Sequence, residues 1–245
     1  MKNVAIIIPA YNEVDNIERL VKEINKQVPK STIFIIDDSK ENDTGKLIRR
    51  KKIKVKYFHR KKKMGRGSAV RYGLKKAIKE KKNNIFIEMD ADFSHDPKEL
   101  KKNINFFNKK NLDLLIGSRY LKKSKIINWS TSRIIFSSLA NFLAKNLLNI
   151  SLNDFTNGYR IYSKRSVKKI INKCGNIGDG FIILSEIIVV LNNNSYKIEE
   201  VPSIFVNRKR GESSVNLKLV FASFLGLIKL FIYKRKKINL ISKNI

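Results

Sequence analysis

Short, mostly apolar runs alternate with amphipathic segments through the first half of the chain. Such runs are typical of strands buried on both faces of a sheet, and we predict strands at residues 3–8, 32–36, 53–58, 85–89 and 112–117. Between them, apolar residues recur at helical spacing, most clearly over 13–28, where Asn12 is a candidate N-cap, and over 68–80. Strands alternating with helices predict an α/β fold with a mostly parallel sheet covered by helices on both faces.

The second half of the chain has longer helical patterns. We predict helices over 130–149 and 181–191 and a strand over 198–206. We expect a main domain at 1–214, followed at 215–245 by an amphipathic helix and a basic tail. That helix fits a membrane interface or packing on the core equally well. The sequence has no uninterrupted apolar stretch of 18 residues, so it predicts no clear membrane span.

Composition adds a strong positive charge. The 245 residues include 52 Lys and Arg but 21 Asp and Glu, for a formal net charge of +31. This balance first suggests a nucleic-acid partner. However, only 13 of the 52 are arginine, and a general bias toward Lys, Asn and Ile accounts for the lysines. Aromatic residues interleaved with basic ones, as in single-strand binders, are not found. Nucleic-acid binding is therefore the remote alternative.

The scarce carboxylates gather where predicted strands end. Asp37 and Asp38 follow one strand, and Asp90 and Asp92 follow another. In parallel sheets the ligand crevice lies at the carboxyl ends of the strands. Residues two apart in an extended strand end point to the same side, and paired carboxylates suit Mg²⁺ or Mn²⁺ held against substrate phosphates. The sequence therefore predicts a metal site at Asp90 and Asp92. The single cysteine, Cys174, excludes an internal disulfide and is read as a small buried residue.

Several motifs recur in an order that resembles a known family. The first set comprises Pro9 to Glu13, Asp37-Asp38, Gly65 to Gly73, Asp90 to Pro97, and Gly117 to Tyr120. The second comprises Trp129 to Arg133, Ser137, Asp154 to Arg160, Val201-Pro202, and Arg208 to Ser213. Over residues 3–230 the chain resembles the dolichol- or polyprenol-phosphate mannosyltransferases, which are inverting GT-A-fold enzymes of glycosyltransferase family 2.

The resemblance implies roles for individual residues. The implied nucleotide-sugar site consists of Pro9, Tyr11, Glu13, Asp37, Asp38 and Asp90. The implied ligands of Mg²⁺ or Mn²⁺ are Asp90, Asp92 and Ser94. The implied acceptor-phosphate site consists of Arg119, Arg133, Ser137 and Arg208. Asp92, Arg119 and Arg133 are the implied catalytic residues. Because acids are scarce, we expect these arginines to serve phosphate rather than pair with carboxylates. His95 is expected to be a polar loop residue without catalytic duty.

The implied reaction moves mannose from GDP-mannose to a polyprenyl or dolichyl phosphate, with inversion, at the cytoplasmic face of a membrane to which the protein binds peripherally. The alternative within enzymes is a glucosyltransferase that uses UDP-glucose. A phosphomonoester is largely dianionic at neutral pH, so no general base and no Ser-His-Asp arrangement are expected. Two departures from the family pattern are Ser214, where Lys is common, and the loop with Lys40 and Asn42, where Ser and Asp are usual.

Overall fold

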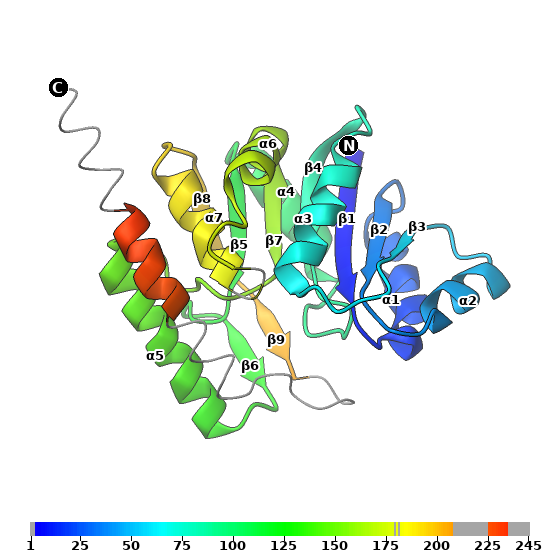
Figure 1. The fold of residues 1–245 in the computed structure, drawn as a ribbon, viewed down its shortest axis with the longest axis horizontal. Coiled ribbons are helices and arrows are strands. Elements are labelled where there is room, and N and C mark those ends of the chain that lie inside the picture. The colour runs from blue at the N-terminus through cyan, green and yellow to red at the C-terminus, as the bar shows by residue number, and fades with distance from the viewer. Residues whose placement is uncertain (1–2, 179, 181, 208–224, 235–245) are drawn as a thin grey trace.

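The described residues form a central seven-stranded sheet (Figure 1). The computed structural model describes residues 3–178, 180, 182–207 and 225–234. In chain order the strands are β1 (Asn3–Ala10), β2 (Thr32–Asp37), β3 (Lys56–His59), β4 (Asn83–Glu88), β5 (Leu114–Ser118), β7 (Arg160–Ser163) and β8 (Ile198–Pro202). Their order in space is β3, β2, β1, β4, β7, β5, β8. Only β7 is antiparallel to its neighbours within this sheet. The predicted mostly parallel sheet is confirmed.

Helices cover both faces of the sheet, as predicted. One face carries α1 (Val14–Gln27), α2 (Asp43–Arg50) and α4 (Glu99–Lys109). The other carries α3 (Arg66–Ala77), α5 (Thr131–Leu148), α6 (Lys164–Lys173) and α7 (Ile182–Asn192). Successive strand residues point to opposite faces, so Ile6 packs with the first group and Ile7 with the second. This double burial explains why the strands are apolar throughout.

The antiparallel direction of β7 determines which loops meet at the ligand edge. Strands β1, β2, β4, β5 and β8 all end at the same edge of the sheet. Because β7 runs the other way, it begins there, with Arg160 opposite Glu88 on β4 and Ile116 on β5. The loop before β7, residues 154–159, is thereby placed beside the ends of β4 and β5.

Three local expectations were wrong or incomplete. The predicted strand 198–206 is two strands, because the chain leaves the main sheet after Pro202, and β9 (Ile204–Val206) pairs with β6 (Lys125–Ile127). Asn12 is not the N-cap of α1: its backbone is left-handed (φ 57°), and Glu13 precedes the helix instead. Strands β6 and β7 and helix α6 were not predicted.

The described part of the C-terminal segment, residues 225–234, is helical and lies beside α5 (Figure 1). Leu227 and Leu230 are buried in the same cluster as Leu148 of α5. Lys234 Nζ donates to the carbonyl of Leu148. This part of the tail therefore packs on the core. The expected domain boundary between 214 and 215 lies outside the described residues.

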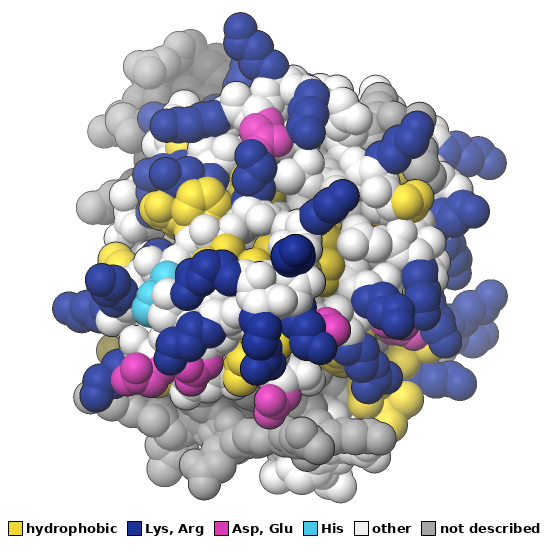
Figure 2. Space-filling model, turned by 90° about the vertical axis from the view of Figure 1, so that its right-hand side faces the viewer, with side chains coloured by type: hydrophobic (Ala, Val, Ile, Leu, Met, Phe, Trp, Pro, Cys, Tyr) yellow, Lys and Arg dark blue, Asp and Glu magenta, His cyan; other side chains and the backbone are white. Residues whose placement is uncertain are grey.

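The surface charge is dispersed. On the face that carries α2 and β3, Lys and Arg side chains are spread over the coloured part of the view, with carboxylates and apolar side chains between them (Figure 2). Such a distribution agrees with the view that most of the lysine is compositional.

Gly73 is where α3 approaches the sheet most closely. A Cβ at this position would lie 2.5 Å from Ile7 Cγ2 and 3.1 Å from Ile36 Cγ1. Replacing a helical Gly by Ala gains about 1 kcal/mol of propensity, but forcing a methyl into a packed core costs about 1–3 kcal/mol. We expect Gly73→Ala to lower the free energy of unfolding in denaturant titrations by up to about 2 kcal/mol, the difference between these two effects. Gly180→Ala is the control, since a Cβ there meets no atom within 4 Å; equal stability of both variants would contradict this packing.

Candidate active site

Asp37, at the end of β2, ties the loops after β1 and β2 together. Its carboxylate is fully buried and accepts hydrogen bonds from the backbone and hydroxyl of Ser39 (2.9 and 2.5 Å) and from the Tyr57 hydroxyl (2.9 Å). Ser39 Oγ in turn accepts from the backbone N–H of Asn12 (2.8 Å). Burial, and then the Asp37 charge, raise the pKa of Tyr57 above its ordinary value. Asp37 is therefore a fixed, internally bonded carboxylate beside the first loop.

Asp38 holds the next loop through an arginine. Arg60 binds it with two nitrogens, Nε to Oδ1 at 2.5 Å and Nη2 to Oδ2 at 2.7 Å, and donates a third hydrogen bond to Ser68. The backbone N–H of Met64 also donates to Asp38 (3.0 Å). This two-pronged pair fixes the whole segment from β3 to the start of α3. Arg60 was not among the predicted site residues.

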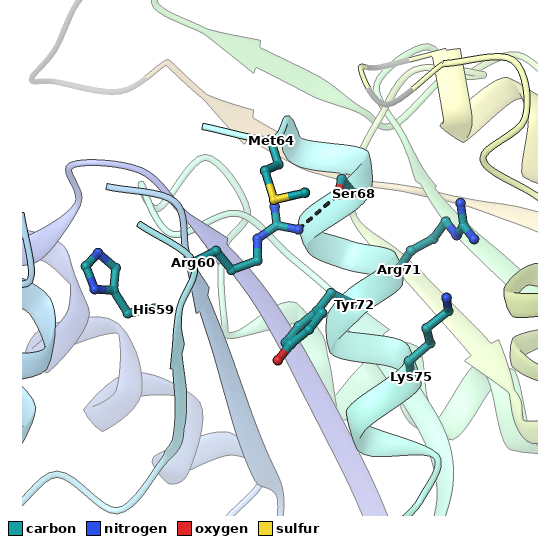
Figure 3. Close-up of a pocket in the computed structure, with 7 residues that line it drawn as sticks. All are labelled: His59, Arg60, Met64, Ser68, Arg71, Tyr72 and Lys75. Atoms are coloured by element: carbon teal, nitrogen blue, oxygen red, sulfur yellow. Dashed lines mark hydrogen bonds between the residues drawn. The ribbon is translucent and has the colours of Figure 1, made fainter. Parts of the chain in front are cut away.

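A pocket of about 440 Å³ lies along this segment and the outer face of α3 (Figure 3). It is lined by His59, Arg60, Met64, Ser68, Arg71, Tyr72 and Lys75. The Arg60–Ser68 hydrogen bond crosses it, while Arg71 and Lys75 extend side by side from α3 and His59 points away from both (Figure 3). The pocket thus adjoins the Asp38–Arg60 pair, and the predicted metal ligands are not among the residues that line it.

Tyr11 lies just beyond β1 with an exposed ring (43% exposed). Lys63, from the segment that Asp38 holds, places its ammonium 4.3 Å from the ring centroid. Pro9 is half-buried in β1, and Glu13 accepts a hydrogen bond from Asn16 (2.6 Å). The structure thus brings the predicted Pro9–Glu13 and Asp37-Asp38 segments together at one edge, and the Tyr11 ring is not a core aromatic.

Asp90 and Asp92 lie in a turn. Strand β4 ends at Glu88, and Phe93 has left-handed backbone (φ 60°), so the expectation that both carboxylates project from an extended strand end is wrong. Asp92 Oδ1 instead accepts from the backbone N–H of Ser94 (3.0 Å), which holds the turn closed. Ser94 itself is buried. The turn follows from the left-handed residue at 93, which reverses the chain toward Pro97.

Arg66 is a site residue that the sequence did not single out. Its Nε and Nη2 both donate to Asp90 Oδ1 (2.9 and 2.7 Å), and Nη1 donates to Glu88 Oε1 (2.5 Å). Glu88 is fully buried and also accepts from the Tyr162 hydroxyl (2.7 Å). Burial by itself lowers the pKa of Arg66, but the charges of Asp90 and Glu88 outweigh it, so the guanidinium stays charged. A glutamate inside an apolar strand was the available signal, because such a charge needs a partner.

His95 links the turn to the loop before β7. The backbone N–H of Asp90 donates to its Nδ1 (3.1 Å), so the ring proton is on Nε2, which donates to Asn157 Oδ1 (2.8 Å). Asn157 Nδ2 then donates to the carbonyl of Gly117 at the end of β5. The imidazole is fully buried between the rings of Tyr159 and Phe205. The expected polar loop residue is therefore an internal connector.

Arg119 is paired with a carboxylate, contrary to expectation. Its Nε and Nη2 donate to the two oxygens of fully buried Asp154 (2.8 Å each), and Nη2 also donates to Thr156 (2.6 Å). Burial alone would raise the pKa of Asp154, but the charge and hydrogen bonds of Arg119 outweigh burial and lower it. The scarcity of acids was a poor guide, because one buried acid is enough to engage this arginine.

Arg133 and Ser137 lie on α5 next to Arg119. The Arg119 and Arg133 guanidinium carbons are 5.3 and 4.1 Å from the centroid of the Trp129 ring. Arg133 Nη1 donates to Asn207 (3.0 Å). The Ser137 carbonyl accepts from Asn141 one turn along α5. Three of the four predicted acceptor residues are thus neighbours, and Arg208 lies outside the described residues.

Comparison with known proteins identifies the family. Residues 5–171 match the family described as Glycosyl transferase family 2. The chain belongs to this family. It is therefore a glycosyltransferase.

Two curated relatives resemble the chain over most of its length. It is 31% identical over 215 residues to "Polyprenol monophosphomannose synthase" of Mycolicibacterium smegmatis, covering 86% of this chain and 80% of the relative. It is 31% identical over 217 residues to "Undecaprenyl-phosphate mannosyltransferase" of Micrococcus luteus, covering 87% of each. Both alignments are longer than the family match at 5–171, which itself includes Arg119 and Arg133.

The fold is that of GT-A glycosyltransferases. The glucosyl-3-phosphoglycerate synthase of Mycobacterium tuberculosis, solved with Mn²⁺, UDP and glucosyl-3-phosphoglycerate, matches with a TM-score of 0.66 over 95% of this chain and 80% of that chain. The sequence identity is 14%, so this likeness shows the fold alone.

The side chains of this family 2 enzyme fit a divalent cation that takes some of its ligands from substrate or water. Among the described residues no group of three or more His, Cys, Asp or Glu side chains could hold a metal. Two carboxylates, Asp90 and Asp92, stand in one turn. Mg²⁺ and similar hard cations are commonly bound by one or two carboxylates plus substrate phosphates and water. The residues therefore fit a cation that is held mainly together with a diphosphate.

The buried Arg119–Asp154 pair should contribute more to the free energy of unfolding of this glycosyltransferase than an exposed ion pair does. Asp154→Asn leaves a buried guanidinium without its counter-charge, which costs about 3–5 kcal/mol. Because the folded pKa of Asp154 is lowered, the pair stabilises above the unfolded pKa near 3.9, and this contribution is lost as the pH falls through the folded pKa. Unfolding titrations at several pH values should show that the variant lacks this acid-dependent component.

The exposed pair of Asp43 and Lys46 (3.0 Å) provides the control for this prediction. Asp43→Asn should change stability by about 0–1 kcal/mol. If both variants lost a similar free energy of unfolding, the buried Arg119–Asp154 pair would contribute no more than an exposed ion pair.

Proposed function

We propose that this enzyme transfers a mannosyl group from GDP-mannose to a polyprenyl or dolichyl phosphate, with inversion, to give polyprenyl-phosphate-mannose. The main support is the pair of curated relatives, both named for mannose and a polyprenyl carrier, at 31% identity over most of the chain. The geometry supports the same division of labour. Asp90 and Asp92 lie in the turn after β4, where a cation and a donor diphosphate could be held. Arg119 and Arg133 both lie against the Trp129 ring, where an acceptor phosphate could be held.

The donor side is formed by the loops after β1, β2 and β4. The exposed Tyr11 ring offers a stacking surface for a nucleobase, and the Asp38–Arg60 pair fixes the wall beside it. Asp90 and Asp92 would hold Mg²⁺ or Mn²⁺, with Ser94 in the same turn. The cation would supply charge neutralisation for the departing diphosphate. The side chains of these three loops would orient the donor so that its anomeric carbon faces the acceptor side.

The acceptor side is formed by β5, α5 and the loop before β7. A phosphomonoester dianion can attack the anomeric carbon directly, so the protein has to position it and need not remove a proton. Arg133 and Ser137 of α5 would bind the phosphate. Arg119, which Asp154 holds, would contribute a fixed positive charge next to it.

A side-by-side donor assay tests this proposal. Purified protein with Mg²⁺ should transfer labelled mannose from GDP-mannose to polyprenyl phosphate and should transfer little glucose from UDP-glucose. Asp92→Asn should lower the rate by at least about a hundredfold, since it removes a ligand-forming charge. Preferential use of UDP-glucose would contradict GDP-mannose as the donor and would identify the enzyme as a glucosyltransferase. No transfer from either donor by folded protein would refute the proposal, and near-normal activity of Asp92→Asn would refute its role.

We also propose peripheral binding to the cytoplasmic face of a membrane, through α5 and the helix at 225–234. Four large apolar residues of α5 are more than half exposed: Ile135 (60%), Phe136 (57%), Leu139 (52%) and Phe142 (62%). Leu225, Ile228 and Ile232 are exposed on the neighbouring helix. In the described part of the chain no helix is long and apolar enough to cross a bilayer. An apolar face next to the acceptor arginines suits a substrate whose tail remains in lipid.

Vesicle co-sedimentation measures this binding. The double variant Phe136→Ser, Phe142→Ser should bind phosphatidylglycerol-containing vesicles about tenfold or more weakly, because each ring buries apolar surface worth about 1.5–3 kcal/mol. Lys101→Gln, Lys102→Gln on α4 is the charge control and should bind almost as well as the wild type. Equal binding of the Phe variant, or a larger loss in the Lys variant, would mean that charge alone drives association.

A further inference from the structure

Arg66 occupies a position that the helix does not favour. It is the first residue of α3, and a cation near a helix N-terminus is opposed by the helix dipole. Its side chain is 15% exposed and reaches away from the helix to the end of β4. The cost of this placement is offset by its two carboxylate partners, so the guanidinium serves the carboxylates rather than α3.

The guanidinium is enclosed on several sides. Glu88, which is fully buried, receives Nη1, and Asp90 Oδ1 receives both Nε and Nη2. Nη2 also lies 3.4 Å from the carbonyl of Gly158, where a Cβ would overlap the guanidinium. Three separate segments, the start of α3, the end of β4 and the loop before β7, therefore close around one cation.

We propose that Arg66 is a built-in counter-cation of the metal site, which makes metal binding depend on the donor diphosphate. This inference rests on the proposed function. A divalent cation that approaches Asp90 alone meets a positive charge within a few ångströms and a carboxylate oxygen that already accepts two hydrogen bonds. Both effects weaken binding, and the repulsion is strong where water is scarce.

A donor diphosphate changes this balance. Its negative charges attract the cation and the guanidinium together, and its oxygens can accept N–H groups of Arg66 in charge-assisted hydrogen bonds. The cation and the nucleotide should therefore bind cooperatively, with Arg66 as the coupling residue. A purely structural Arg66 that only anchors the turn through Glu88 would give no such coupling.

The test measures Mn²⁺ binding without turnover, by electron paramagnetic resonance of free Mn²⁺, with and without GDP or UDP. Wild-type protein should bind Mn²⁺ alone weakly and much more tightly with the preferred nucleotide. Arg66→Gln keeps an N–H donor for Glu88 but removes the charge. It should bind Mn²⁺ alone about tenfold more tightly, and the gain on adding nucleotide should fall by a similar factor. Arg66→Lys, which keeps the charge, should bind Mn²⁺ alone as weakly as the wild type.

Lys75→Gln is the matched control, because it removes one exposed charge from the same helix away from the carboxylates. It should leave both affinities within twofold. Circular dichroism verifies folding, and Arg66→Met replaces Arg66→Gln if the latter does not fold. If folded Arg66→Gln binds Mn²⁺ alone no more tightly than the wild type, the coupling role is overturned while the proposed function stands. If wild-type protein binds no Mn²⁺ even with either nucleotide, the metal part of the proposed function fails, and the coupling role with it.

Discussion

The arrangement of the loops at the edge where β1, β2, β4, β5 and β8 end depends on ion pairs between carboxylates and arginines that are largely removed from water. In the described part of the chain, Asp38 pairs with Arg60, Glu88 and Asp90 share Arg66, and Asp154 pairs with Arg119. Isolated buried charges are very unfavourable, and removal of one partner leaves the other uncompensated. Each pair therefore fixes its two segments to each other. The loops of this edge are ordered before any substrate arrives.

These pairs also explain how so basic a chain uses its few arginines. A guanidinium offers a planar fork that can satisfy two oxygens at once, whereas a lysine offers a point charge on a flexible stem. Arg60 and Arg119 each use that fork on one carboxylate. Arg160, which is fully buried, donates to the carbonyls of Phe155, Asn157 and Leu184 and holds the loop before β7. The basic residues of the described part of the chain therefore include dispersed surface cations and at least four arginines, Arg60, Arg66, Arg119 and Arg160, that are bound to internal partners.

Local patterns in the sequence were sufficient for six of the seven strands of the main sheet, for most helices and for the position of Asp90 and Asp92 after a strand end. Apolar runs and helical spacing depend on neighbours along the chain, and Asp90 and Asp92 are adjacent to a strand end. The partners of those carboxylates were not predictable in the same way. Arg66 and Asp90 are 24 residues apart, and Arg119 and Asp154 are 35 apart, so only the topology brings them together. β7 was missed because a strand of four residues that begins with Arg160 and ends with Ser163 gives little apolar signal, yet its reversed direction brings Asp154 to the edge.

A continuous chain of hydrogen bonds connects the two halves of the site. It runs from the backbone of Asp90 to His95, from His95 to Asn157, and from Asn157 to the carbonyl of Gly117, two residues before Arg119. Every member except the backbone of Asp90 is buried. An in-line displacement requires the attacking and departing groups to be held in one geometry, and small misplacements are costly. Because Nδ1 of His95 accepts and Nε2 donates, both neighbours fix the orientation of the ring, and this chain holds the turn with Asp90 and Asp92 against the segment that carries Arg119.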